Sequence, residues 1–148
     1  LEVGVAAFPE KHPESPDLAH DAKVLSLKQS AGASYAMTQL FFTVEAYTEL
    51  VETSKQAGAT MPIIPGLMPI SNADRIVRMA EMSGAKLPTE LLKKFETADE
   101  AQARIIGMDY SIKLAADLVA AGAPGLHIFS LNLAKAALEV ARGAGLCR

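Results

Sequence analysis

Short apolar runs alternate along the chain with longer stretches in which apolar residues recur at helical spacing. The apolar runs predict four strands, at residues 3–8, 35–42, 61–67 and 126–131. The longer stretches predict helices that begin near Ser15-Pro16, Thr43, Ser71 (with Asp74), Leu87, Thr97 (with Glu100) and Ser130 or Asn132. Three of these helices are expected to end at Gly32, Gly58 and Gly122, because glycine readily adopts the left-handed conformation that terminates helices.

The predicted order of elements, βαβαβαααβα, indicates a parallel sheet with helices packed against it. Two architectures have this order: an open doubly wound sheet and part of a (β/α)8 barrel. The chain contains no GxGxxG or Walker loop, which disfavours the common nucleotide-binding open sheets. We therefore expect a single α/β domain over residues 1–148 that supplies about four βα units, a half barrel of the TIM type.

Composition and charge exclude several classes of protein. The net charge is −3, and no cluster of lysine and arginine is present, which argues against a nucleic-acid partner. Cys147 is the single cysteine, so neither a disulfide framework nor a cysteine-based metal site is expected. This cysteine usage favours a reducing, cytoplasmic setting. No apolar run is long enough to cross a membrane, and we expect no membrane association.

Polar and conformationally special residues follow or interrupt the predicted strands. The segment PEKHPES, residues 9–15, comes directly after the first strand, and Gln39 lies in the second. Pro65-Gly66 lies in the third strand, and Ser130 belongs to the fourth. In a parallel barrel these positions gather at the carboxyl ends of the strands, where the active sites of such barrels lie. We therefore expect the functional site at this edge of the sheet.

Four segments carry a family resemblance. VAAFPEKHPES, GASYAMTQLFF, IIPGLMPIS and GLHIFSLN resemble, in this order and spacing, the methylenetetrahydrofolate reductase family. The resemblance implies a (β/α)8 barrel that passes a hydride from NAD(P)H through FAD to 5,10-methylenetetrahydrofolate, giving 5-methyltetrahydrofolate. The four segments correspond to the last four strands of the family barrel. The first four strands, with two carboxylates on which the family relies, have no counterpart in this chain.

The resemblance implies that FAD is bound by Phe8, His12, Ser15, Asp21 and Lys28. Phe8 stands where the family usually has tyrosine, so the stacking surface is kept and the hydroxyl is lost. Asp21 and Lys28 lie seven residues apart on one helix face, where a carboxylate suits ribose hydroxyls and an ammonium suits phosphate. From the residues alone, two other interpretations stay open. His12 could belong to a turn and capping network with Glu10, and Asp21 and Lys28 could be ordinary solvated helix charges.

The resemblance also implies two substrate-binding residues. Gln39 is placed over the flavin, where its amide contacts the folate pterin and the nicotinamide, and it is the expected catalytic residue. Arg75 stands where some family members carry a substrate-contacting glutamine. Leu133 stands where the family typically has a substrate-contacting arginine. The other interpretation of Gln39 is a buried amide satisfied by backbone, and His127 is expected to pack in a layer of the barrel.

Two hypotheses follow, from different classes. The first is that the chain is a fragment of a longer reductase, consistent with an apolar strand that begins directly after Leu1-Glu2. The second is a stand-alone, non-catalytic half barrel that binds flavin or pterin or serves as an association module. A half barrel leaves two strand edges and an inner face uncovered, so both hypotheses predict a homo-oligomer or a complementing half barrel. An unrelated open α/β binding domain is a weaker third alternative.

Overall fold

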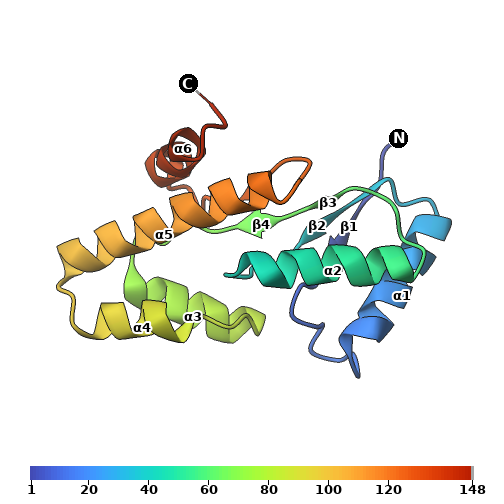
Figure 1. Ribbon diagram of the computed structural model, residues 1–148, viewed down its shortest axis with the longest axis horizontal. Helices are drawn as coiled ribbons and strands as arrows, with labels where there is room; N and C mark the ends of the chain where they lie inside the picture. The colour runs from blue at the N-terminus through green and yellow to red at the C-terminus, as the bar shows by residue number, and fades with distance from the viewer. Residues whose placement is uncertain (148) are drawn as a thin grey trace.

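The computed structural model describes residues 1–147, and Figure 1 labels most of its elements. The strands are β1 (Gly4–Ala7), β2 (Tyr35–Thr38), β3 (Ile63–Ile64), β4 (Gly66–Leu67) and β5 (His127–Ile128). The helices are α1 (Leu18–Ser30), α2 (Val44–Gln56), α3 (Ala73–Ser83), α4 (Thr89–Glu96), α5 (Glu100–Ala120) and α6 (Ala134–Gly143). All the described strand pairs are parallel, so the predicted α/β class with parallel strands is confirmed.

The predicted third strand is present as two short strands separated by Pro65. On one side β3 pairs with β2 in the sheet β1-β2-β3, and on the other β4 pairs with β5. Proline has no N–H to donate to a ladder, but the Pro65 carbonyl accepts a hydrogen bond from the His127 N–H at 2.9 Å. The run from β3 to β4 therefore connects the two sheets. A half barrel of four βα units stays a prediction, because the strands form two separate ladders.

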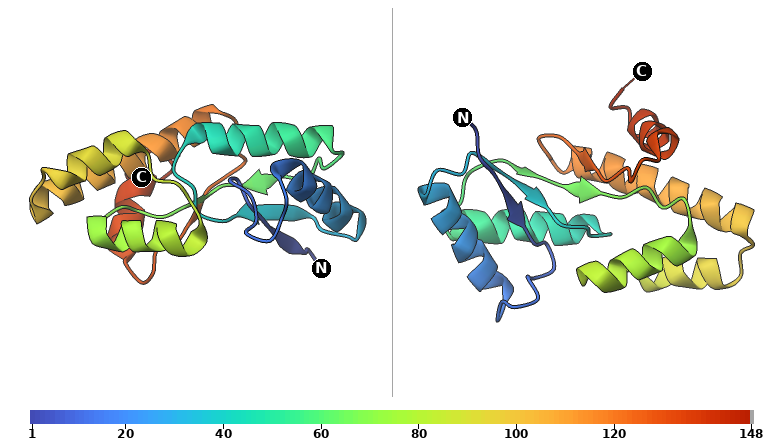
Figure 2. Two further views of the ribbon diagram at one scale, coloured as in Figure 1. Left: turned by 90° about the horizontal axis from the view of Figure 1, so that it is seen from below. Right: turned by 180° about the vertical axis from the view of Figure 1, so that it is seen from behind.

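Helices cover one face of the first sheet. Ala7, Ala36 and Ile63 alternate onto that face and are buried in the main hydrophobic cluster. The opposite face carries Tyr35 and Met37, which are only half-buried. The right-hand view of Figure 2 shows these strands in front of α2, with no helix in front of them. Parallel sheets are normally covered on both faces, so this side of the sheet lacks a layer.

Several predicted helix boundaries are confirmed. The Thr43 side chain accepts a hydrogen bond from the Ala46 N–H at 3.4 Å and caps α2. Gly32, Gly58 and Gly122 each have a positive φ directly after the C-terminal residue that caps α1, α2 and α5. The boundaries of these three helices therefore follow from local sequence.

Other predicted caps were wrong by one to three residues. The side chains that cap α1, α3 and α5 are Asp17, Asn72 and Asp99, not Ser15, Ser71 and Thr97. The capping box of α5 pairs Asp99 with Gln102 in place of the predicted pair of Thr97 and Glu100. Neither Ser130 nor Asn132 caps α6, which begins after Leu133 without a side-chain cap. Each of these segments offers several residues able to cap, and the path of the backbone decides between them.

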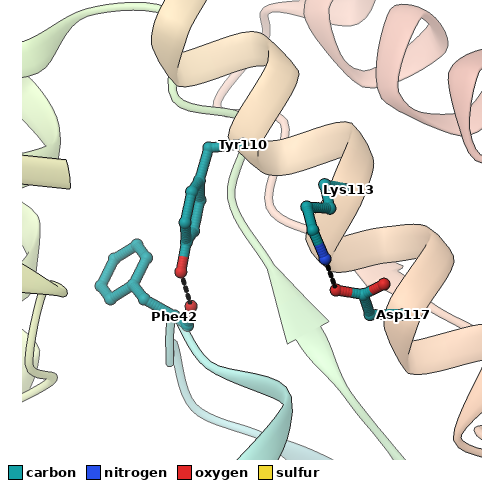
Figure 3. Close-up of polar contacts among 4 residues, drawn as sticks. All are labelled: Phe42, Tyr110, Lys113 and Asp117. Carbon is teal, nitrogen blue, oxygen red and sulfur yellow. Dashed lines mark hydrogen bonds and ion pairs between the residues drawn. The ribbon is translucent and has the colours of Figure 1, made fainter. Parts of the chain in front are cut away.

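Two hydrophobic clusters form the core. The larger one joins α1, α2, α5 and α6 to the helix-covered side of the strands, and the smaller one lies among α3, α4 and the segment after β4. Tyr110, on α5, packs against both clusters. Its hydroxyl donates a hydrogen bond to the Phe42 carbonyl at 2.5 Å, as Figure 3 shows. Through this bond α5 fixes the segment that follows Gln39.

The Tyr110 hydrogen bond predicts a loss of stability at alkaline pH. Burial raises the pKa of Tyr110 above its ordinary 10.0, and Glu45 and Asp117 raise it further. The folded state therefore holds this proton more tightly than the unfolded chain, so stability is full below about pH 10 and falls as the pH rises beyond it. Burial raises the pKa of Tyr47 in the same way, so both tyrosines contribute to this fall.

Tyr110→Phe is expected to lower the free energy of unfolding by about 1 kcal/mol near neutral pH. It is also expected to reduce the loss of stability at alkaline pH. Urea denaturation at neutral and alkaline pH measures both effects. Tyr35→Phe is the control, because the Tyr35 hydroxyl makes no hydrogen bond among residues 1–147. This prediction would be contradicted if the free energy of unfolding decreased as steeply with rising pH in Tyr110→Phe as in the parent chain.

Candidate functional site

The loop after β1 is held by a buried carboxylate. Asp21 lies in the first turn of α1 and is 7% exposed. Its Oδ2 accepts a hydrogen bond from the His12 N–H at 2.7 Å, and its Oδ1 accepts one from the Ser15 hydroxyl at 2.5 Å. Both oxygens of Asp21 therefore bind the loop, which fixes residues 12 and 15 against the helix.

The loop is also organised from within by Lys11. The Lys11 backbone has φ 86°, an uncommon conformation for a residue with a side chain. Its ammonium donates hydrogen bonds to the carbonyls of Ser15 at 2.6 Å and His12 at 3.2 Å. The loop carbonyls thus surround one cation, and Asp21 binds the loop N–H and hydroxyl donors. Sequence reasoning missed this role of Lys11, because no local pattern predicts a left-handed lysine.

The imidazole of His12 has a defined orientation. Its ring packs edge-to-face against Phe8, with the ring centroids 4.6 Å apart. Its Nδ1 accepts a hydrogen bond from the Glu14 N–H at 3.1 Å. A neutral imidazole that accepts at Nδ1 carries its proton on Nε2, so His12 has a hydrogen-bond donor to offer.

A cavity of about 400 Å³ opens between the end of β1 and the face of α1. All five residues predicted to bind the cofactor line it: Phe8, His12, Ser15, Asp21 and Lys28. The Lys28 ammonium donates a hydrogen bond to the Ala6 carbonyl at 2.9 Å, which holds the cation at the cavity. The other lining residues are Ala6, Ala7, Val24 and Leu25. An aromatic ring, an ammonium and apolar walls suit part of a large aromatic, phosphate-bearing ligand.

Gln39 lies where the open face of the sheet meets the end of β2. Its backbone N–H donates to the Ala7 carbonyl at 2.8 Å, which extends the pairing of β1 with β2 by one residue. Its side-chain Oε1 accepts a hydrogen bond from the Leu40 N–H at 2.9 Å. Among residues 1–147 the Gln39 Nε2 has no hydrogen-bond partner. The backbone thus satisfies the Oε1 of the Gln39 amide, and the two N–H donors on Nε2 stay available to a ligand.

Pro65-Gly66 brings two backbones into close contact beside Gln39. A Cβ at Gly66 would lie 2.5 Å from the Thr38 carbonyl oxygen, closer than real Cβ atoms come. The Gly66 N–H donates to the Thr38 hydroxyl at 2.8 Å. Glycine is therefore required at position 66, and its contacts fix the start of β4 against Thr38, the residue before Gln39.

Arg75 lies in a different cavity from the five cofactor residues. This cavity of about 560 Å³ lies between the starts of α3 and α6. Arg104 and Lys135 also line it, and sequence reasoning missed both, because each comes from a helix remote in sequence from Arg75. His127 is half-buried and packs edge-to-face against Phe129, with the centroids 4.5 Å apart.

No helix in the described part of the chain is both long enough and apolar enough to cross a membrane. The fold and the cavities define the class: a parallel α/β domain whose candidate binding residues lie at the carboxyl ends of its strands. The sequence profile described as methylenetetrahydrofolate reductase matches residues 1–145. The chain belongs to the methylenetetrahydrofolate reductase family, as its four motifs predicted.

Three curated relatives illustrate the match. The chain is 33% identical to "Probable methylenetetrahydrofolate reductase (NADPH)" of Caenorhabditis elegans, over 97% of the chain and 22% of that protein. It is 34% identical to "Methylenetetrahydrofolate reductase (NADH) 1" of Arabidopsis thaliana, over 97% of the chain and 26% of that protein. It is 31% identical to "5,10-methylenetetrahydrofolate reductase" of Escherichia coli K12, over 99% of the chain and 50% of that protein. The chain thus spans at most half the length of these relatives.

Proposed function

We propose that the chain contributes to the flavin-dependent reduction of 5,10-methylenetetrahydrofolate to 5-methyltetrahydrofolate with NADH or NADPH, as part of a reductase. The observation that carries this proposal is the cavity beside β1, which collects all five residues predicted to bind FAD. The family membership and the printed names of the relatives support the folate substrate and the nicotinamide donor.

The residues of the cavity fit the flavin cofactor by their chemistry. Bound FAD would supply a ring system that accepts a hydride and passes it on. Lys28 would bind a phosphate through its ammonium, and Phe8 would provide an aromatic surface. His12 would donate a hydrogen bond from Nε2. Asp21 holds the loop through both carboxylate oxygens, so its first role is to position His12 and Ser15.

Gln39 and Arg75 are the proposed substrate-binding residues. The free Nε2 donors of Gln39 suit the acceptors on the edge of a pterin, and its position at the end of β2 suits a substrate bound next to the flavin. Arg75 contributes a guanidinium from the first turns of α3. Gln39 would act by orienting the pterin toward the flavin.

The open face of the sheet supports the proposal of a covering partner. β1 pairs only with β2, and β5 pairs only with β4, within the described residues. Two free edges and an uncovered face suit further parallel strands, either from the remainder of a longer reductase or from a second copy of this chain. The same observation favours the alternative function, a non-catalytic flavin- or pterin-binding half barrel or association module.

An assay of hydride transfer tests the proposed function and separates it from the alternative. A reductase that contains this chain together with the four strands it lacks is loaded with FAD and mixed with NADPH or NADH and methylenetetrahydrofolate, and methyltetrahydrofolate is measured by mass spectrometry. Product formation that Gln39→Ala lowers at least about tenfold is the expected result. Bound flavin with no product would overturn the catalytic role and favour the binding module. Thr48→Ala, on the exposed side of α2, is the control.

A further inference from the structure

The ammonium of Lys11 is bound by backbone carbonyls alone. Its Nζ donates to the carbonyl oxygens of Ser15 at 2.6 Å, His12 at 3.2 Å and Pro13 at 3.5 Å. An ammonium has three donors, so these three carbonyls can use all of them. Within residues 1–147 no carboxylate lies at ion-pair distance from Lys11. Converging backbone carbonyls are the ligands with which proteins also bind monovalent metal cations.

The backbone of Lys11 is in a conformation that suits glycine better than lysine. Its φ of 86° lies in the left-handed region, which glycine adopts without steric cost and a residue with a Cβ does not. A strained backbone persists only where surrounding contacts hold it. The contacts of the Lys11 ammonium must therefore offset the strain of its own backbone, and the side chain, not the backbone, gives this position its role.

The turn that follows Lys11 lies between a cation and an anion. It is closed by the Ser15 N–H, which donates to the His12 carbonyl at 3.0 Å. The Lys11 ammonium binds the carbonyls of His12 and Ser15, and the Asp21 carboxylate accepts from the N–H of His12 and the hydroxyl of Ser15. Residues 12 and 15 are thus each held twice, once by each charge.

Lys11 is set apart from the cavity beside β1. His12 and Ser15 line that cavity, whereas Lys11 does not, so it can affect a ligand there only through these two residues. We propose that Lys11 is a positioning residue whose ammonium acts as a tethered monovalent cation and holds the turn so that His12 and Ser15 face the cavity. The inference rests on the proposed function, because FAD is the proposed ligand of that cavity.

Lys11→Gly tests this inference, because it relieves the backbone and removes the cation in one change. The flavin titration of the chain is expected to show a Kd about tenfold higher in this variant. A lysine that is merely tolerated at this position predicts the opposite, an affinity that is unchanged or tighter. Lys23→Ala is the matched control, because it removes the same charge from an exposed position on α1 and should change Kd less than about twofold.

Rescue by a small ammonium ion shows whether the carbonyl contacts carry the effect. Ethylammonium chloride is expected to restore much of the affinity lost in Lys11→Gly, because its N–H groups can donate to the same carbonyls. Tetramethylammonium chloride has the same charge and no N–H donor, and at equal ionic strength it should restore none. Unchanged or tighter FAD binding in Lys11→Gly, absent recovery, or equal recovery with both salts would overturn the inference.

Nitrogen NMR of the His12 imidazole reports the turn without flavin. In the parent chain Nδ1 accepts from the Glu14 N–H at 3.1 Å, so we expect the signal of a neutral ring protonated on Nε2. In Lys11→Gly this signal is expected to shift as the turn loosens, and to return with ethylammonium. A chain that binds no FAD but shows this shift removes the proposed function alone. FAD binding with an identical His12 signal in both chains removes this inference alone.

Discussion

Gly107→Ala is expected to lower the free energy of unfolding by about 1–2 kcal/mol. Gly107 lies within α5, where alanine is ordinarily favoured over glycine by about 1 kcal/mol. A Cβ at this position would lie 2.2 Å from the Ile70 carbonyl oxygen and 2.6 Å from the Ile70 Cγ2. A contact with backbone at that distance cannot be relieved by rotating a side chain. The overpacking cost therefore lies toward the upper end of about 1–3 kcal/mol and exceeds the gain in helix propensity.

This close contact also positions the cavity that contains Arg75. One turn after Gly107, the buried Ser111 hydroxyl accepts a hydrogen bond from the Ile70 N–H at 2.9 Å and donates one to the Gly107 carbonyl at 2.8 Å. The segment at Ile70 leads directly into α3, which carries Arg75. Displacing this segment should therefore disturb the cavity as well as the core.

Thermal and urea denaturation measure the effect of Gly107→Ala. Gly125→Ala is the control, because a Cβ at Gly125 would meet no atom within 4 Å and its φ is not positive. Its free energy of unfolding is expected to stay within about 0.5 kcal/mol of the parent. A Gly107→Ala chain as stable as the parent, or more stable, would show that α5 and the Ile70 segment are not packed as described.

Asp21→Asn is expected to weaken FAD binding about tenfold and to lower the free energy of unfolding by about 1–3 kcal/mol. The carboxylate accepts from both the His12 N–H and the Ser15 hydroxyl. An amide has a single acceptor oxygen, so the Ser15 hydroxyl keeps a bond only by accepting one from the NH₂ group, and both contacts lose the added strength that the carboxylate charge gives them. The loop would then hold His12 beside Phe8 less firmly. A tenfold loss corresponds to about 1.4 kcal/mol of binding free energy.

Asp17→Asn is the matched control for Asp21→Asn. Asp17 lies just before α1, and its side chain caps the helix by accepting from the His20 N–H at 2.8 Å. Asparagine caps helices as well as aspartate does, so this variant removes the same charge at little cost in stability. Flavin fluorescence and urea denaturation measure both variants. Equal flavin affinity in the two would remove the role assigned to the Asp21 contacts.

The local sequence predicted where the helices and strands lie better than it predicted which strands pair with one another. Apolar runs and helical spacing locate every described helix, and Gly32, Gly58 and Gly122 mark three helix ends correctly. The third predicted strand was wrong as one continuous strand, because Pro65 interrupts its ladder and its two halves pair with different neighbours. Which neighbour a short strand pairs with depends on the path of the chain beyond it, which no local pattern contains.

The candidate site was predictable where its residues lie close in sequence. Helical periodicity puts Asp21 and Lys28 on one face of α1, and the family resemblance assigned that face to the cofactor; the cavity beside β1 contains both residues. The left-handed Lys11 and the two bonds of Asp21 depend on the exact backbone path and leave no local signal. The cavity that Arg75 and Lys135 both line was not predicted, because these residues are sixty positions apart and only the fold brings their helices together.

The central claim is that the cavity beside β1 binds FAD, and a titration of the chain with FAD, followed by flavin fluorescence, tests it most directly. Native mass spectrometry of the same sample reports the oligomeric state. We expect saturable binding that Lys28→Ala weakens about tenfold, while Lys23→Ala, an exposed lysine on the same helix, leaves it unchanged. A folded chain that binds no FAD, or that loses affinity equally in both variants, would contradict the claim.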